Sequence, residues 1–179
     1  MAELAEQKEK LSKRLQSIKE VLSKDYVAEA GWFPDAEPYP NGKAVVDVAL
    51  LQEYGGVSEQ GFTVPPRPFV RPTFAALKSE GVGGATIIKA IMTGDRGAVL
   101  GVMSSLANLV KWDLVRTIRN IYDPPLAPMT IEKRRAARKM ARKTRQWGGR
   151  AQVFAGSLTK PLIDTGHMIQ SIEARSYAK

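Results

Sequence analysis

The sequence has no cysteine, a single histidine and no long apolar run. Without cysteine, the 179-residue chain forms no disulfide, no thiolate metal site and no cysteine nucleophile. The longest uncharged stretch, 97–110, falls well short of the roughly 20 apolar residues that cross a bilayer, so we expect no membrane partner. The charged N-terminal region lacks the apolar segment of a signal peptide. A cytosolic site of assembly fits this composition.

The excess positive charge is confined to one part of the chain. The formal net charge is +9, yet residues 1–31 carry six basic and six acidic side chains, and residues 32–130 carry nine of each. Residues 131–179 carry twelve basic and three acidic side chains. The densest part contains Lys133, Arg134, Arg135, Arg138, Lys139, Arg142, Lys143, Arg145 and Arg150. The sequence therefore predicts a basic appendage on an electrically balanced body.

Apolar residues at helical spacing predict an amphipathic helix from Ala2 to about Ser23. One narrow apolar seam contains Leu4, Leu11, Leu15, Ile18 and Leu22, and the other faces are charged. Two interpretations remain open. The helix packs on its own domain, or it docks on a neighbouring subunit, because so narrow a seam suits contact between helices.

Turn signals separate the elements that follow. The sequence Tyr39-Pro40-Asn41-Gly42 predicts a type I′ turn between strands at 30–33 and 43–48. The second strand is expected to pass into a short helix that ends at Gly55. The prolines of 64–72 predict an extended segment that leads into a helix from about Thr73.

The rest of the chain is expected to be mainly helical. The sequence predicts helices at 85–92, 95–121, 130–146 and 164–171, and a closing strand at 172–177. The longest of them would be the main core helix, with an apolar stripe of Leu100, Met103, Leu106, Val110, Leu114 and Ile118. Gly148 and Gly149 are expected to end the helix that carries the basic residues.

Two proline-led segments, 124–131 and 160–168, each precede an expected helix. Proline fixes its own φ and disfavours a helical conformation in the residue before it. Thr130, and either Asp164 or Thr165, are then expected as N-caps, because their side-chain oxygens accept hydrogen bonds from free backbone N–H groups. The two segments bracket the basic part of the chain.

No motif in the sequence predicts an enzyme, a cofactor site or a metal site. Asp164, His167 and Ser171 would share a helical face, but a Ser-His-Asp triad needs an exposed nucleophile beside an oxyanion hole, and no G-x-S-x-G elbow occurs. The Gly81–Gly84 loop is not a dinucleotide fingerprint, and no Walker A motif occurs. The carboxylates are scattered rather than clustered with the histidine. We expect a protein that is not an enzyme, with no catalytic residue and no cofactor.

The basic run predicts either a solvated face or contact with an anionic partner. Cationic residues cover most of the circumference of the expected helix, which can therefore bury little apolar surface. The candidate contact residues are Arg134, Arg135, Arg138, Lys139, Arg142, Lys143 and Arg145. The partner would be an acidic protein surface or nucleic acid, with Trp147 and Phe154 either stacking on bases or anchoring the appendage. The alternative function of the chain is therefore nucleic-acid binding through residues 133–150.

Several short motifs, taken in order, resemble one family. They are Gly31-Trp32-Phe33-Pro34-Asp35-Ala36, the turn at 39–42, the segment 48–55, the segment Pro65-Pro66-Arg67-Pro68-Phe69-Val70-Arg71-Pro72-Thr73, and the two proline-led segments. This series resembles the neck and tail-completion proteins of tailed bacteriophages, which include tail terminators and virion morphogenesis proteins. The likeness covers about residues 28–131 and 160–177.

The resemblance implies an α+β fold in which a small antiparallel sheet packs on helices. It divides the chain into an N-terminal helix (1–27), a core (28–131 and 160–179) and a basic helical insertion (132–159) that departs from the family pattern. It also assigns a structural or interface role to Arg67, Pro68, Phe69, Arg71, Pro125, Pro128, Asp164, Thr165 and Gly166.

The resemblance also implies a function. The chain would be a structural virion protein, assembled in the host cytoplasm, whose copies form a ring at the head–tail neck, and we expect a hexamer. The ring would complete or terminate the tail tube and join it to the head. Its partners would be neighbouring neck or connector proteins and tail tube or sheath proteins, and genomic DNA in the channel would be a further contact.

Overall fold

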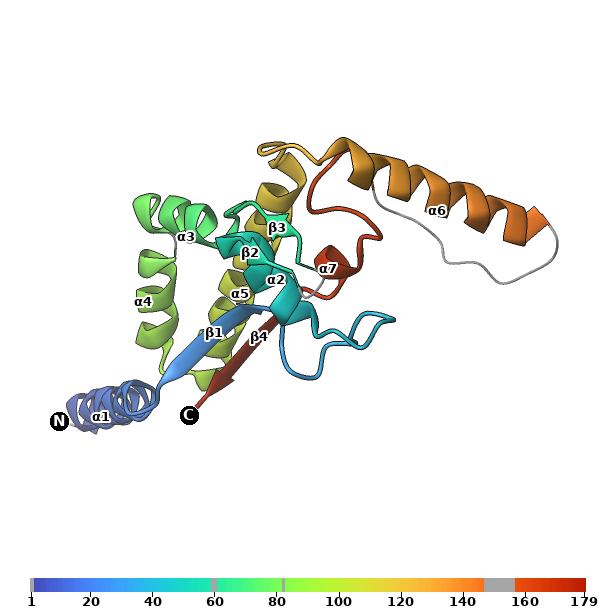
Figure 1. Ribbon diagram of the computed structural model, residues 1–179. Helices are drawn as coiled ribbons and strands as arrows, with labels where there is room; N and C mark the ends of the chain where they lie inside the picture. Colours follow the sequence, from blue (N-terminus) through green and yellow to red (C-terminus); the bar gives the residue numbers. More distant parts are fainter. Residues whose placement is uncertain (1, 59–60, 82, 147–156) are drawn as a thin grey trace. The chain divides into compact units, whose positions relative to one another are not determined.

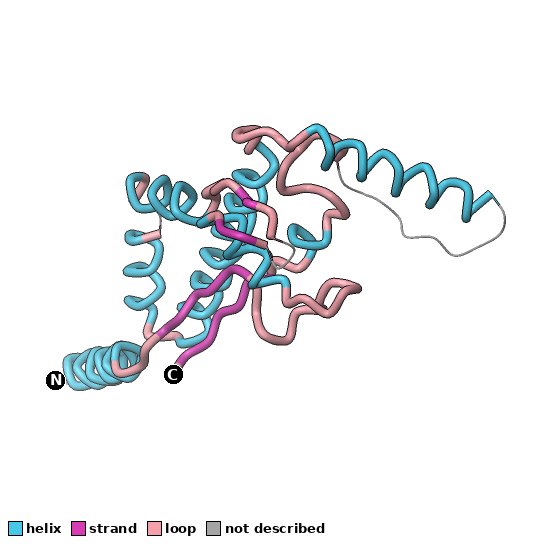
Figure 2. Tube along the Cα trace, viewed as in Figure 1, coloured by secondary structure: helices cyan, strands magenta, loops and turns pink. Residues whose placement is uncertain are grey.

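The computed structural model describes residues 2–58, 61–81, 83–146 and 157–179. It confirms an α+β fold with an N-terminal helix, in which short strands accompany a majority of helix (Figures 1 and 2). The chain forms two compact units. Unit 1 contains Met1–Ala30, Ala76–Lys111 and Ala174–Lys179, and unit 2 contains Gly31–Ala75 and Trp112–Glu173. These units differ from the division into helix, core and insertion that the resemblance implied.

Unit 1 combines segments from both ends of the chain. Its elements are α1 (Ala2–Leu22), β1 (Tyr26–Gly31), α4 (Gly84–Thr93), the first part of α5 (Arg96–Asn120) and β4 (Glu173–Ala178). Strand β4 pairs with β1, and α1 packs against α4. Val21, Ala90 and Val99 form the core. Two further hydrogen bonds join the ends of the chain: Tyr177 Oη donates to Glu29 Oε1 (2.8 Å), and Lys179 N donates to the carbonyl of Asp25 (2.8 Å).

Unit 2 surrounds a larger apolar core. Its elements are α2 (Val45–Tyr54), β2 (Gly56–Val57), β3 (Thr63–Val64), the first part of α3 (Val70–Ser79), the second part of α5, α6 (Pro128–Gln146) and α7 (His167–Gln170). Strands β2 and β3 are antiparallel, with Gly56 opposite Val64. The core contains Val45, Ala49, Phe69, Leu114, Val115, Ile118, Leu162, Met168 and Ile172. It therefore joins α2, α5 and the segment that contains α7.

The long helix α5 contributes to both cores, but its buried stripe is only partly the expected one. Leu114 and Ile118 are buried as expected, whereas in the first half of the helix Val99 and Ala107 are buried and the expected residues are half-buried. Helix α5 is long enough and apolar enough to span a membrane, judged by its length and composition alone. The core helix of a soluble protein meets the same two criteria. Lys111, Asp113 and Arg116 interrupt its apolar surface.

The expected hairpin around residues 39–42 is wrong. The turn itself forms, since Gly42 N donates to the carbonyl of Tyr39 (2.8 Å), but among the described residues only glycines have positive φ, so Asn41 does not adopt the type I′ conformation. Residues 43–48 do not form a strand, because α2 begins at Val45 and buries Val45 and Ala49 on one face. The expected helix end at Gly55 is confirmed, with φ +72°.

The helix starts expected at Thr73, Thr130 and Asp164 are also wrong. Helix α3 begins at Val70, so residues 70–72 are helical rather than extended. Helix α6 begins at Pro128, which suits the first helical position because proline has no N–H to satisfy there. Helix α7 begins after Gly166 (φ +84°), and Thr165 Oγ1 accepts a hydrogen bond from His167 N (3.2 Å). The expected end of α6 at Gly148 lies outside the described residues.

Candidate functional site

Arg134 anchors the basic helix α6 to the segment 157–164. Its guanidinium donates from Nη1 to the carbonyls of Ser157 (2.9 Å) and Lys160 (2.8 Å), and from Nη2 to that of Pro161 (3.3 Å). Its Nε lies 3.2 Å from Asp164 Oδ1. Arg134 is only 9% exposed. Although Arg134 is among the expected contact residues for an external partner, its guanidinium binds a loop of its own chain.

A second buried arginine, Arg67, holds the other proline-led segment. It donates from Nε to the carbonyl of Pro124 (2.9 Å), from Nη2 to that of Pro125 (3.3 Å) and from Nη1 to Gln52 Oε1 (3.3 Å). Burial lowers the pKa of Arg67, and the nearby charge of Arg134 lowers it further. The two guanidinium groups are therefore close enough to repel each other, and the backbone carbonyls that they bind offset this cost.

Glu53 fixes the start of α3. Its carboxylate accepts hydrogen bonds from the backbone N–H groups of Phe69 (2.6 Å), Val70 (2.9 Å) and Arg71 (3.2 Å), and it pairs with Arg71 Nε (3.0 Å). Burial alone would raise the pKa of Glu53, but these hydrogen bonds together outweigh it and lower the pKa. A residue of α2 thus caps a helix that begins seventeen positions later. No local signal in the sequence marks Glu53 as this cap, because the N–H groups that it binds are at least sixteen residues away.

The other motif residues have structural contacts of the same kind. Phe69 is fully buried and packs edge-to-face against Trp32, with ring centroids 5.7 Å apart. Trp32 Nε1 in turn donates to the carbonyl of Met168 (2.8 Å). Pro68 is exposed between Arg67 and Phe69. These contacts place the 31–36, 65–73 and 160–168 motifs around one core.

The residues considered as a hydrolase triad have other partners. The side chain of Asp164 lies beside Arg134, and His167 Nε2 lies 2.8 Å from the carbonyl oxygen of Glu37. The hydroxyl of Ser171 donates to the backbone carbonyl of His167 (2.8 Å), as expected for a serine within a helical turn. Among the described residues, no group of three or more histidines and carboxylates is arranged to hold a metal ion.

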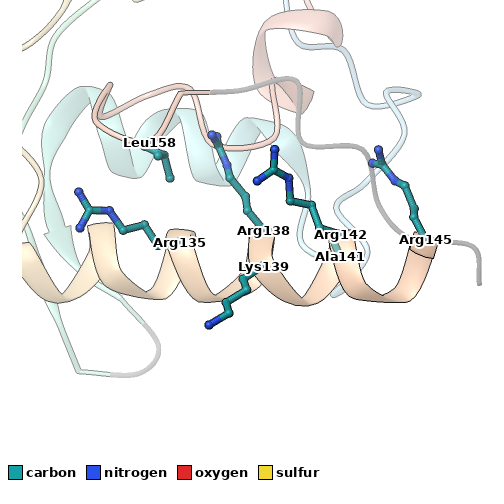
Figure 3. Close-up of a pocket in the computed structure, with 7 residues that line it drawn as sticks. All are labelled: Arg135, Arg138, Lys139, Ala141, Arg142, Arg145 and Leu158. Carbon is teal, nitrogen blue, oxygen red and sulfur yellow. The ribbon is translucent and has the colours of Figure 1, made fainter. Parts of the chain in front are cut away.

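Four of the expected contact residues lie along one side of α6. Arg135, Arg138, Arg142 and Arg145 extend toward the side of the helix that Leu158 occupies, whereas the side chain of Lys139 extends away from Leu158 in this view (Figure 3). These residues and Ala141 line a hollow of about 710 Å³. Arg138 and Arg145 interact with other groups of the chain, whereas Arg135 and Arg142 are exposed.

Lys139 and Lys143 extend this surface around the helix. Both lysines are exposed, like Arg135 and Arg142. Because successive residues of an α-helix are about 100° apart, these four cations fall within about 100° of the circumference. We refer to Arg135, Lys139, Arg142 and Lys143 as the cationic stripe.

A groove of about 850 Å³ lies beside the start of α6. It is bounded by the β2–β3 connection and by the segment that Arg67 holds. Its lining includes Phe62, Leu126, Met129 and Lys133. The ammonium group of Lys133 lies 5.4 Å from the centre of the Phe62 ring, so this lysine covers an aromatic side chain of its own chain.

The leucine seam of α1 is the largest exposed apolar feature of unit 1. Leu4, Leu11, Leu15 and Leu22 are each between 55% and 63% exposed, and Ile18 is half-buried. The helix packs on α4 through a different face, on which Val21 is buried and Arg14 donates to the carbonyl of Met92 (3.3 Å). The expectation that α1 packs on its own domain is met through its contact with α4, whereas docking of the exposed seam on a neighbouring subunit stays a prediction.

No family model, curated protein or solved structure matches this chain. The geometry of its own residues is therefore the basis for interpreting the site. The likeness to phage neck proteins remains a prediction from the sequence motifs.

Proposed function

We propose that this chain is a structural subunit of a ring at the head–tail neck of a tailed phage. In that role it completes or terminates the tail tube and joins it to the head. Copies associate with one another in a ring, for which six is the expected number, and the ring contacts connector proteins on one side and tail proteins on the other. Assembly takes place in the host cytoplasm, and the protein remains in the virion.

One observation carries the proposal: the large apolar residues of α1 face solvent although the helix is already packed on α4. Exposed apolar patches of this kind mark surfaces that another protein covers. Two of the motif residues that resemble neck proteins have partners within the chain. Arg67 donates to the backbone carbonyls of Pro124 and Pro125, and Asp164 pairs with Arg134. The exposed apolar seam and the motif residues that hold the chain's own backbone both fit a structural subunit of an assembly.

The partners of the buried polar side chains in the described part of unit 2 favour the same role. The polar side chains that come together in unit 2 are occupied by carbonyl and N–H groups of the backbone, as Arg134 and Glu53 show. Such contacts position loops, and loops positioned on a rigid core commonly form binding surfaces. This argument supports a non-enzymatic function.

Mass measurement of the full chain tests the proposal. Native mass spectrometry of the purified protein should give a closed oligomer, and electron micrographs should show rings with a central opening. Antibody labelling of phage particles should place the protein between head and tail. A strictly monomeric protein that is also absent from particles would contradict the proposal.

A further inference from the structure

The cationic stripe of α6 is an exposed cluster of four positive charges, beside which the helix carries a single acidic residue. Arg135, Lys139, Arg142 and Lys143 are all exposed, and no salt bridge within the described part of the chain involves any of them. Glu132 is the one acidic residue in the sequence of α6. We propose that the stripe binds the phosphate backbone of nucleic acid, without regard to base sequence.

A comparison with α1 shows what is unusual about α6. Helix α1 also has exposed lysines, but Lys10 pairs with Glu6 (2.8 Å) and Lys13 pairs with Glu9 (2.7 Å). The cations of α1 are thus balanced at spacing i,i+4, which stabilises an isolated helix. The cations of the stripe repel one another instead. A polyanion removes this repulsion, so its binding is favourable wherever the stripe is accessible.

The composition of the stripe favours phosphate over an acidic protein surface. The large apolar residues of α6, namely Met129, Ile131 and Met140, lie outside its arc. Protein interfaces gain most of their binding energy from buried aromatic and other apolar anchors and contain few lysines. Binding to phosphates needs only cations, because the release of condensed counterions drives it.

The same composition predicts that base sequence is not read. Helix α6 contains no aromatic residue that a base could stack on, and its one amide side chain, Gln146, is the last residue of the helix. From Arg135 to Lys143 the helix rises about 12 Å. Duplex DNA carries a negative charge about every 1.7 Å along its axis, so several phosphates lie within reach of the stripe.

The inference does not depend on the proposed ring, since the four side chains belong to one helix of one copy. The test uses the full-length protein and two fluorescent DNA duplexes of equal length and unrelated sequence. Affinity is measured by anisotropy over a salt series. We expect equal affinity for both duplexes and a slope of log K against log[salt] of up to about −3.6, because each phosphate contact contributes about −0.9.

The variant Arg135→Gln/Lys139→Gln should bind both duplexes more weakly and reduce the size of the slope by about 1.8. A second variant, Arg142→Gln/Lys143→Gln, should have the same effect and guards against a folding defect in the first. The matched control is Lys10→Gln/Lys13→Gln, which removes the same charge from α1 and should leave binding unchanged. Circular dichroism and the native mass are recorded for each protein, so a loss of assembly is separable from a loss of DNA binding.

Three results would overturn the inference. One is an unchanged salt slope in both α6 variants. Another is a clear preference for one of the two duplexes. The third is competition by poly-glutamate that exceeds competition by unlabelled DNA at equal charge, which would identify an acidic protein as the partner.

Discussion

At the scale of single residues, three buried charged side chains hold the backbone of unit 2. Arg67 and Arg134 bind five backbone carbonyls between them, and Glu53 binds three backbone N–H groups. Hydrogen bonds to charged groups contribute more than neutral ones, and removing one partner leaves buried groups unsatisfied. The stability of unit 2 is therefore sensitive to substitutions that conserve size but remove charge.

Glu53 makes the stability of unit 2 dependent on pH. Its pKa is lowered in the folded chain, so the unfolded chain binds the proton more readily. The stabilisation is complete above the unfolded value of about 4.3 and is lost as the pH falls from there through the lower folded pKa. We expect Glu53→Gln to cost about 2 kcal/mol at neutral pH and to flatten the loss of stability in acid.

Urea unfolding at about pH 7 and at about pH 3.5, followed by tryptophan fluorescence, measures this effect. Trp32 is a suitable reporter because it packs against Phe69, and the backbone N–H of Phe69 donates a hydrogen bond to Glu53. Asp47→Asn is the matched control, since Asp47 is an exposed acid of the same helix. An equal acid sensitivity in the wild type and Glu53→Gln would show that Glu53 is not the group responsible.

Gly55 is another residue at which a single substitution should change the stability of the protein. Its φ of +72° and ψ of −179° are almost restricted to glycine, and a Cβ there would lie 2.8 Å from Pro66 N and 2.9 Å from the carbonyl oxygen of Val64. We expect Gly55→Ala to destabilise the protein by about 2 kcal/mol or more. Gly101→Ala is the control, because Gly101 is a helical position with nothing within 4 Å of the added Cβ. In thermal melts the control should be unchanged or up to about 1 kcal/mol more stable.

At the scale of elements, two predictions that rest on neighbouring residues were confirmed, whereas two that depend on contacts with distant parts of the chain were wrong. The extents of α1 and α5 were predicted well because apolar spacing is a local signal, to which Pro124 adds a stop signal after α5. The strand expected at 43–48 was wrong because a run of valines suits either element, and burial of Val45 and Ala49 in the unit 2 core favours the helix. The start of α3 was missed because its cap, Glu53, is remote in sequence.

The same difference between local and distant signals applies to the candidate site. The sequence identified the cationic residues of α6, since composition alone reveals them. It could not distinguish Arg134, which is buried, from Arg135, which is exposed. The difference depends on where the carbonyls of 157–161 lie, and those are more than twenty residues away along the chain.

The leucine seam of α1 gives a prediction about association. Leu11→Glu/Leu15→Glu should prevent formation of the proposed oligomer, because two carboxylates would have to be buried in an apolar contact. It should leave the helix intact, since both side chains are exposed and point away from α4. Analytical ultracentrifugation measures the mass, and circular dichroism measures the helix content.

Gln16→Glu serves as the control for the seam. Gln16 is exposed on α1 but lies outside the seam, so a carboxylate added there should not change the mass. If the seam variant keeps the mass of the wild type, α1 does not form the contact between copies.

At the scale of the whole molecule, unit 1 is closed by residues from the two ends of the described chain. Strand β4 pairs with β1, and Lys179 N and Tyr177 Oη add two further hydrogen bonds. We expect deletion of residues 174–179 to leave β1 unpaired and to loosen unit 1. Hydrogen exchange should become faster in β1 and in α1, whereas α6 should keep its wild-type rates.

Tyr177→Phe is the control for this deletion. It removes only the hydrogen bond to Glu29, which is exposed, and should change the exchange rates of β1 very little. If the deletion changes exchange no more than Tyr177→Phe does, β4 contributes little to unit 1.

The placement of the cores also has a consequence for synthesis. Leu162, Met168 and Ile172 complete the core of unit 2, and β4 completes the sheet of unit 1, so both units need residues beyond 160. Domains commonly fold as they leave the ribosome, the N-terminal part first. Here neither unit can close until that late segment has emerged. A chain that stops early leaves Phe69 without Leu162, Met168 and Ile172, so quality-control proteases can recognise it before it joins an assembly.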